Sequence, residues 1–245
     1  MVNYRKLIIL IGLFVSSHSY AFDWPSKVTA KSWLVANENG HIIQSENPDQ
    51  VRSIASISKL MTVMIVLDAH QDPMQSIGLF TRAQLIDMAL IRSDNHAAEL
   101  LCDNYPGGRA SCVRAMNSKA HLLEMPNTNF VEPTGLSIMN VSTARDLIRL
   151  VDAASIYPEI THAANTSEVK IKIRKRWLVF RNTNPIIGKR HKFIVSKTGY
   201  INASGGCIVM MLDTDIGNRI VIVLGSKNTH TRIPEAEFIF ENVKE

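Results

Sequence analysis

Two residues able to act as a nucleophile and its base lie in the segment "ASISKLMT", residues 55–62. Ser56 precedes Lys59 by three positions, a spacing that puts both side chains on one face of a helix about one turn apart. Ser56 also stands where the helix should begin, so backbone N–H groups and the helix dipole would favour an oxyanion there. Lys59 has apolar neighbours, and burial among them would lower its pKa toward useful basicity. The pair predicts a serine activated by a lysine, although a surface lysine near a helix start is the commoner explanation when the pattern stands alone.

Two further motifs supply polar groups for the same site. The segment "IRSDNHAAELL" places Ser93-Asp94-Asn95 between two predicted helices, so a hydroxyl and an amide project from a loop. The segment "FIVSKTGYI" places Lys197-Thr198-Gly199 at the end of an apolar strand, where a glycine permits close backbone approach by a ligand. Alone, the first triplet is explained by helix capping and the second by a polar strand face. In the order S-x-x-K, S-x-N, K-T-G they match the motif set of penicillin-binding proteins and class A β-lactamases.

Longer segments extend this match over about residues 30–240. They are "SDNHAAELL", "YPGGRASCVRAMN", "FVEPTGLSIMNVSTARDL", "FRNTN" and "SKTGYINASGGCIVM". With them the chain resembles the low-molecular-mass penicillin-binding proteins, which are serine D-alanyl-D-alanine carboxypeptidases and endopeptidases, and most closely their short periplasmic endopeptidase branch. The resemblance implies an α/β (α+β type) transpeptidase-like fold. We expect a five-stranded antiparallel sheet flanked by helices, with a helical subdomain inserted at about 70–155 and the active site at their junction.

The resemblance also implies roles for nine residues. Ser56 is the acylated nucleophile and Lys59 its base, while Ser93 relays a proton to the leaving amine and Asn95 holds the substrate's amide. The residues implied on the substrate side are Lys197, Thr198, Gly199, Tyr200 and Arg232. Of these, Lys197 and Thr198 would bind the carboxylate of D-alanine, and the N–H groups of Ser56 and Tyr200 would form the oxyanion hole. Arg232, in the loop after the last strand, is either a further carboxylate contact or a plain surface residue.

This reading predicts a serine DD-peptidase of peptidoglycan stem peptides, acylated by β-lactams and working without metal or cofactor. Whether it removes terminal D-alanine or cuts D-alanyl cross-links is left open. One rival is a β-lactamase, which needs a carboxylate to activate the deacylating water; Glu132 lies near the right place, but the "TGLS" that follows fits a peptidase better and favours a structural role. The other rival is a non-catalytic peptidoglycan-binding homologue.

Two departures from the family bear on specificity and location. Ser93 follows Ser56 by only 37 residues, so a hairpin or loop of the helical subdomain is expected to be trimmed. The chain stops soon after its last predicted helix, without the C-terminal β-domain and amphipathic anchor of some relatives. We therefore expect a soluble protein with no membrane anchor once its signal is removed.

Periodicity gives a compatible layout. Two apolar runs around Asn39-Gly40 predict a hairpin, and residues 56–68 predict a buried helix. Thr81 with Gln84 predicts a capping box, and helices are expected near 95–104, 109–121 and 143–154. Alternation then returns in "EVKIKI" and in the meander "KFIVSKTG", "CIVMMLDT" and "RIVIVLGS", before a final helix at about 234–243. Strands at both ends of the chain predict one sheet in which the terminal segments meet.

The first 21 residues predict a secretory signal peptide, leaving residues 22–245 as one catalytic domain in the periplasm. Arg5 and Lys6 precede an apolar run, Leu7 to Val15, that is far too short to span a bilayer. Removing the signal leaves 25 basic and 22 acidic residues. A basic cluster at 170–176 allows a weak attraction to anionic cell-wall polymer, but nothing predicts nucleic-acid binding.

The three cysteines permit one bond. Cys102 and Cys112 can face each other across a Pro-Gly-Gly turn, and export would allow them to pair or leave them free. Cys207 lies in an apolar strand and is expected in the core.

Overall fold

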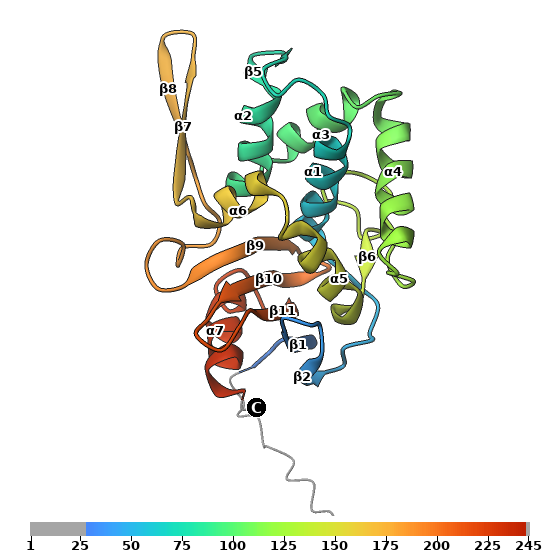
Figure 1. Cartoon of the computed structure of the whole chain (residues 1–245), viewed down its shortest axis with the longest axis vertical. Helices are drawn as coiled ribbons and strands as arrows, with labels where there is room; N and C mark the ends of the chain where they lie inside the picture. Colours follow the sequence, from blue (N-terminus) through green and yellow to red (C-terminus); the bar gives the residue numbers. More distant parts are fainter. Residues whose placement is uncertain (1–27, 244–245) are drawn as a thin grey trace, which may run out of the picture.

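The chain is built around a five-stranded antiparallel sheet in the order β2-β1-β11-β10-β9 (Figure 1). The structure, a computed structural model, describes residues 28–243. The first strand of the sheet pairs with the last, Ser32 opposite Leu224, as the strands at the two ends of the chain predicted. The sheet consists of β1 (Ser32–Asn37), β2 (Ile42–Glu46), β9 (Lys192–Ile201), β10 (Gly205–Asp213) and β11 (Arg219–Ser226).

Alternate residues of these strands face two separate layers of helix. On one face, Leu34 and Ala36 belong to the larger hydrophobic cluster, which also contains residues of α1 (Ser58–Asp68) and α5 (Ala144–Ala154). On the other face, Trp33 and Val35 share a second cluster with Ile233 and other residues of α7 (Arg232–Asn242). A sheet with apolar side chains on both faces must be covered twice, which gives the expected sheet with helices on both sides.

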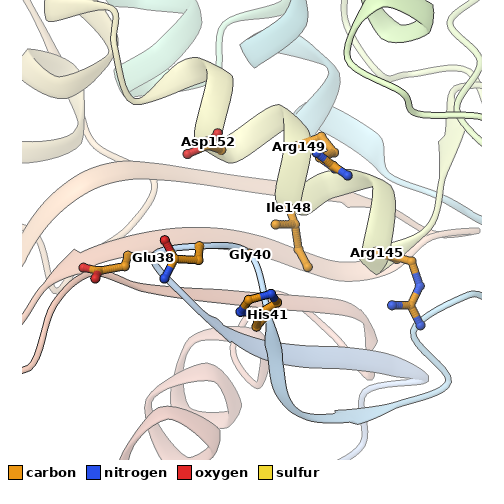
Figure 2. A pocket seen from close by; sticks show the side chains of 8 residues that line it. Glu38, Gly40, His41, Arg145, Ile148, Arg149 and Asp152 are labelled. Carbon is orange, nitrogen blue, oxygen red and sulfur yellow. The ribbon is translucent and has the colours of Figure 1, made fainter.

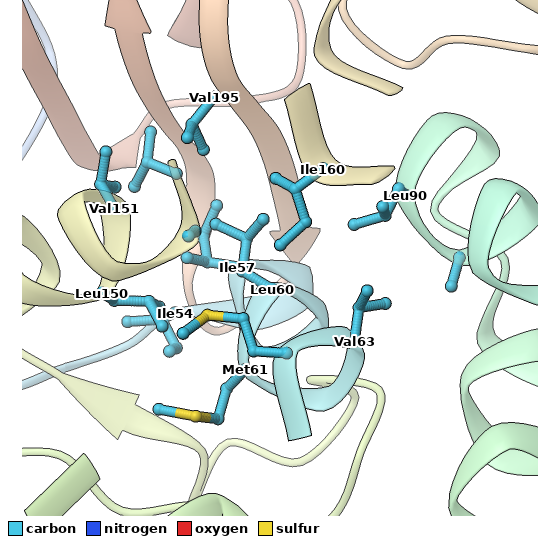
Figure 3. Close-up of a cluster of buried hydrophobic side chains, with 14 of the residues drawn as sticks. Ile54, Ile57, Leu60, Met61, Val63, Leu90, Leu150, Val151, Ile160 and Val195 are labelled. Atoms are coloured by element: carbon cyan, nitrogen blue, oxygen red, sulfur yellow. The ribbon is translucent and has the colours of Figure 1, made fainter. Parts of the chain in front are cut away.

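The helices include one that is buried on all sides. Met61, Val63 and Leu60 of α1 project in different directions into the same cluster, which is why this helix shows no polar face in the sequence (Figure 3). The helical segments are η1 (Ala55–Ile57), α1 (Ser58–Asp68), α2 (Arg82–Asp87), η2 (Met88–Arg92), α3 (Asn95–Asp103), α4 (Gly108–Leu122), α5 (Ala144–Ala154), α6 (Pro158–Asn165) and α7 (Arg232–Asn242).

Helix starts agree with the capping signals. Thr81 and Gln84 form the predicted capping box at the start of α2, and the Thr143 side chain accepts from the Asp146 N–H at the start of α5. Among the longer elements, α6 and strand β8 were not predicted, and neither were the two-residue strands β3 to β6. Helix α7 begins at Arg232, two residues before the predicted Pro234. α6 is short and lacks a side-chain cap, so its sequence signal is weak.

Three two-stranded sheets lie outside the main sheet. Strand β7 (Glu168–Ile173) was predicted, and it pairs with β8 (Arg176–Arg181) to form a hairpin that projects beside the helices rather than joining the main sheet (Figure 1). The other short strands pair as β3 (Arg52–Ser53) with β6 (Val141–Ser142) and β4 (Ser76–Ile77) with β5 (Phe80–Thr81). In addition, Asn129 forms an isolated bridge to Val141.

Cys102 and Cys112 form a disulfide that joins α3 to α4 across a Cα–Cα distance of 5.4 Å, and Cys207 is a buried free thiol, as expected of a core residue. The predicted signal peptide lies outside the described residues. Within residues 28–243, no helix is both long and apolar enough to cross a bilayer.

Candidate active site

The predicted nucleophile sits on a tight elbow between β3 and α1. Ser56 is the middle residue of the short helix η1, and Ala55 before it has φ +47°, a left-handed conformation that is rare for a residue with a side chain. Gly135 packs directly on this elbow, since a Cβ added there would lie 1.9 Å from the Ala55 carbonyl oxygen. The elbow is therefore held in an uncommon conformation by a neighbouring loop, an arrangement that recurs at functional sites.

Lys59, one turn further on, reaches back to the nucleophile. Its Nζ lies 2.9 Å from Ser56 Oγ, 2.7 Å from Asn95 Oδ1 and 2.6 Å from the Thr134 carbonyl oxygen. A neutral amine has two N–H donors and one lone pair. If the two carbonyl oxygens accept the two N–H groups, the lone pair is left facing the Ser56 hydroxyl, which is the orientation a general base requires.

Burial makes the neutral amine accessible near physiological pH. The Lys59 side chain is fully buried, and loss of solvation lowers its pKa to about 8, against the opposing charge of Glu132. The ordinary pKa of an exposed lysine is 10.5. The apolar helix that surrounds Lys59 is thus the physical cause of its basicity, as the sequence predicted.

Glu132 belongs to the loop that supplies the Thr134 carbonyl, and its carboxylate is fully engaged. Its Oε2 accepts from the backbone N–H and the hydroxyl of Thr134, both at 2.6 Å, and its Oε1 accepts from Gly135 N–H at 2.7 Å and Ser137 N–H at 3.2 Å. A carboxylate with four donors around it shapes a loop and is not free to activate a water. These contacts support the structural role over that of a β-lactamase base.

Asn140 joins this loop to the start of α1 and was not predicted from the sequence. Its amide donates to Ser58 Oγ at 3.0 Å and to the Glu132 carbonyl at 2.8 Å, while its Oδ1 accepts from Val131 N–H at 2.8 Å. The side chain is fully buried. Asn140 therefore fixes the distance between the loop that holds Lys59 and the helix that carries it.

The second motif enters from the junction of η2 and α3. Ser93 has φ +60° and ends the π-helical turn η2, and Asp94 caps α3 by accepting from Ala97 N–H at 2.9 Å. The capping explanation is thus correct for Asp94. Asn95 is the first residue of α3 and points its Oδ1 at Lys59, whereas Ser93 Oγ accepts from Lys197 Nζ at 2.7 Å.

The third motif lies on β9, the edge strand of the main sheet. Lys197 is buried and donates to Ser93 Oγ and, at 2.9 Å, to the Thr198 carbonyl. Its pKa is lowered well below the ordinary value, first by burial and then by the nearby charges of Lys59 and Arg232. Thr198 Oγ1 lies 2.6 Å from Thr183 Oγ1, which belongs to the family-like segment "FRNTN" but was given no role from the sequence. The S-x-x-K, S-x-N and K-T-G motifs are therefore one connected network.

Gly199 has no side chain because the protein's own backbone approaches it. A Cβ there would lie 2.9 Å from Ser56 N and 3.0 Å from the Ile54 carbonyl oxygen. The sequence predicted a close approach at this glycine by a ligand. In the structure the approaching group is η1, so Gly199 brings β9 against the elbow that carries Ser56.

The last two predicted residues lie beside this strand. Tyr200 is partly exposed and its hydroxyl donates to Asn202 Oδ1 at 3.1 Å. Arg232 is buried, and its Nη1 donates to the Gly199 carbonyl at 2.7 Å. Arg232 is the first residue of α7 and not part of a loop, as the sequence had suggested. Because it is buried and bonded to the K-T-G strand, it is not a plain surface residue.

A separate pocket of about 350 Å³ lies between the β1–β2 turn and α5 (Figure 2). Arg145, Arg149 and His41 face it together with Glu38 and Asp152, but it contains none of the predicted site residues.

Across residues 28–243, no cluster of three or more His, Cys, Asp or Glu side chains could hold a metal ion. Ordered hydroxyl, amine and amide groups make up the site instead.

Comparison with known proteins agrees with this geometry. Residues 19–78 and 73–228 match the protein family described as D-alanyl-D-alanine carboxypeptidase. The D-alanyl-D-alanine endopeptidase of Pseudomonas aeruginosa is 39% identical to this chain, and the match covers 95% of this chain and 86% of the length of the relative. The D-alanyl-D-alanine endopeptidase of Escherichia coli is also 39% identical, over 86% of this chain and 76% of its own.

A solved structure gives the same fold. Penicillin-binding protein D2 of Listeria monocytogenes, in its ampicillin-bound form, is 27% identical and superposes with a TM-score of 0.78, covering 87% of this chain and 96% of its own. The fold, the serine–lysine geometry and the family match point to one class of enzyme. The chain therefore belongs to the D-alanyl-D-alanine carboxypeptidase family and is a serine DD-peptidase.

Proposed function

We propose that this chain is a periplasmic DD-endopeptidase, which hydrolyses the D-alanyl bonds that cross-link peptidoglycan stem peptides. The contact between Lys59 Nζ and Ser56 Oγ carries the proposal, because it joins a nucleophile to a base whose pKa is lowered to about 8. The relatives at 39% identity, both named endopeptidases, favour cross-link cleavage over removal of a terminal D-alanine.

Acylation begins at the serine. Ser56 Oγ attacks the carbonyl carbon of the D-alanyl residue while Lys59 Nζ takes the hydroxyl proton. The backbone N–H groups of Ser56 and Tyr200 stabilise the oxyanion that forms. The C–N bond then breaks, leaving an ester on Ser56, and a water hydrolyses this ester in the second half of the reaction.

The leaving amine needs a proton, and the hydrogen bond from Lys197 to Ser93 supports a relay. Ser93 Oγ passes a proton to the departing nitrogen and recovers one from Lys197. Asn95 holds the substrate's amide with its side-chain N–H₂, because its Oδ1 is already occupied by Lys59. Arg232 acts from behind β9, holding the Gly199 carbonyl in place.

The substrate carboxylate is received on the K-T-G strand. Lys197 and Thr198 present an amine and a hydroxyl from the same edge strand, which suits a carboxylate. An arriving anion replaces part of the solvation that Lys197 has lost and favours its charged form. By the same contacts, β-lactam antibiotics carrying a carboxylate would acylate Ser56.

The test is digestion of cross-linked muropeptide dimers, followed by mass analysis. Wild type should convert dimers to monomers, and Ser56→Ala should leave them intact. Loss of only a terminal D-alanine would assign carboxypeptidase activity instead. Rapid turnover of penicillin without peptide cleavage would indicate a β-lactamase, and failure to take up a fluorescent penicillin or to cleave peptides would indicate a binding homologue.

A further inference from the structure

The positive charge of this protein is concentrated in one hairpin. Residues 168–181, which form β7, β8 and their turn, contain six of the 27 Lys and Arg residues of the chain and one of its 22 Asp and Glu residues. This segment carries +5, equal to the net charge of the whole chain, and the remaining residues balance at 21 of each sign. The hairpin is therefore a localised positive surface on an otherwise neutral protein.

The two faces of the hairpin differ in character. Ile171 and its register partner Leu178 lie on one face, and Ile171 is buried in the main hydrophobic cluster. The opposite face pairs Lys172 with Trp177 and Lys170 with Val179. Trp177 is 63% exposed, with Lys172 Nζ 5.9 Å from its ring centre. We call this second face, with the turn Arg174-Lys175, the outer face.

Most of these cations have no acidic partner. Lys170 and Arg181 share the single carboxylate of Glu168, at 3.7 Å and 3.5 Å. Among the described residues, no ion pair is formed by Lys172, Arg174, Lys175 or Arg176. Arg174 also occupies a left-handed turn position, φ +52°, where Gly or Asn would fit with less strain. Unpaired cations gathered on a projecting turn present a surface to an anionic partner.

The base of the hairpin is continuous with the active site. Arg181 ends β8, and two residues later Thr183 Oγ1 lies 2.6 Å from Thr198 Oγ1 of the K-T-G motif. Thr183 N–H also donates to the Ile91 carbonyl in η2, which leads into Ser93. A six-residue strand spans roughly 20 Å. A polymer held at Ser56 would therefore meet the outer face if it extended along the hairpin.

We propose that the outer face of the β7–β8 hairpin is a docking surface for the peptidoglycan strand. Carboxylates of neighbouring stem peptides pair with Lys170, Lys172 and the turn cations, while sugar rings stack on Trp177. This proposal rests on the proposed function, because it takes peptidoglycan as the substrate. It places the polymer around the scissile bond on a surface outside the catalytic cleft. It accounts for an exposed indole and unpaired cations lying together near the turn of a hairpin whose base adjoins the active site.

The binding test uses purified sacculi and a Ser56→Ala background, so that no bond is cut. The triple variant Lys172→Gln, Arg174→Gln, Lys175→Gln removes three exposed charges, and its matched control is Arg114→Gln, Arg149→Gln, Lys227→Gln. Three such contacts are together worth about tenfold in affinity. Co-sedimentation should show about tenfold weaker binding for the hairpin variant and a smaller dependence on salt, with the control unchanged. Equal losses in both variants, or in neither, would overturn the proposal.

Trp177→Ala tests the stacking contact, with the exposed Leu122→Ala as its control. We expect about threefold weaker sacculus binding for the tryptophan variant alone. Two other occupants are separated by parallel measurements on the Ser56→Ala protein. Binding to anionic lipid vesicles but not to sacculi would assign the hairpin to a membrane, and a dimer in light scattering that Trp177→Ala dissociates would assign it to a second copy. Either result overturns the proposal.

In the catalytically active protein, the hairpin triple variant should digest sacculi about tenfold more slowly while its rate of acylation by a fluorescent penicillin stays at the wild-type value. An equal fall in penicillin acylation would place the effect in the cleft and contradict a docking role. If wild type cleaves no peptide at all, the proposed function fails. The sacculus-binding comparison in the Ser56→Ala protein still decides the docking proposal in that case.

Discussion

At the scale of single residues, the basicity of Lys59 should set the pH dependence of acylation. The neutral amine is the active form, and its pKa of about 8 means that its population rises about tenfold per pH unit below pH 8 and saturates above it. The second-order rate constant for acylation by a β-lactam, measured from pH 6 to 10, should follow this curve. Lys59→Arg keeps the charge but cannot lose it, so acylation should fall by at least about 10³-fold. A flat pH profile in the wild type would contradict the assignment.

Glu132 gives a second residue-scale prediction. Glu132→Gln leaves one oxygen and one N–H₂ group among four donors, so two of those donors lose their acceptor. We expect a loss of about 2 kcal/mol in the free energy of unfolding and slower acylation, because the Thr134 carbonyl that holds Lys59 moves. The lifetime of the acyl-enzyme should not lengthen. Normal acylation with a blocked deacylation step would instead identify Glu132 as the base of a β-lactamase.

The sequence predicted those site residues that act through their side chains and lie in a recognisable motif. Ser56, Lys59, Ser93, Asn95 and the Lys197-Thr198-Gly199 segment do meet in space. The Thr134 carbonyl was not found, because a backbone oxygen leaves no signal in residue type. Asn140 and Thr183 lie in segments that resemble the family, but neither was given a role, because each is a common polar residue whose role depends on partners elsewhere in the chain.

At the scale of elements, the approach of β9 to η1 depends on Gly199. Gly199→Ala puts a Cβ 2.9 Å from Ser56 N and 3.0 Å from the Ile54 carbonyl, and both are backbone atoms that cannot rotate away. The strand must shift, and we expect acylation to fall about 100-fold. Gly108→Ala is the control, because that site has open space, although its φ is positive whereas that of Gly199 is not. It should cost some stability but leave acylation by fluorescent penicillin unchanged. Equal acylation in both variants would rule out the packing role.

The disulfide supports a different pair of elements. Cys102 and Cys112 are ten residues apart and connect the end of α3 to α4, whereas Asn95 stands at the start of α3. The replacement Cys102→Ala with Cys112→Ala should lower the free energy of unfolding by about 3 kcal/mol, while acylation at 25 °C is kept. Urea denaturation and penicillin labelling measure the two quantities. Loss of labelling without loss of stability would show that the bond shapes the site instead.

Elements were predicted where one periodicity dominates. The β9–β11 meander has uninterrupted apolar runs, and Thr81 and Thr143 provide local helix starts. Strand β8 was missed because Arg176, Trp177 and the residues after them are mostly exposed and mix charged with apolar types, so no alternation is visible. It is specified by pairing with β7, and such pairing is a tertiary property that a single segment does not encode.

At the scale of the whole molecule, the sequence indicated that the two ends of the chain share a sheet, and β1 does pair with β11. The position of β9 at the sheet edge does not follow from periodicity, because strand order depends on contacts between distant segments. This order matters for function. It puts Lys197 and Lys59, two buried amines from different layers, close enough for the charge of one to lower the pKa of the other.

Burying such an amine should make the stability of the folded protein depend on pH. Lys59 has a pKa of about 8 in the folded protein and a reference value of 10.5, which we take for the unfolded chain. Below pH 8 the amine is protonated in both the folded and the unfolded state, and burying its charge destabilises the folded state by about 3 kcal/mol. Between pH 8 and 10.5 the unfolded state binds more protons, and stability therefore rises with pH. Lys59→Met removes this contribution.

The measurement is the free energy of unfolding in urea at pH 7 and pH 10, for wild type and Lys59→Met. The free energy of unfolding of the wild type, relative to that of Lys59→Met, should increase by up to about 3 kcal/mol as the pH rises. Ser56→Ala retains the amine and should follow the wild-type curve. A pH-independent difference between wild type and Lys59→Met would mean that Lys59 keeps its charge in the folded protein, and Ser56 would then lack its base.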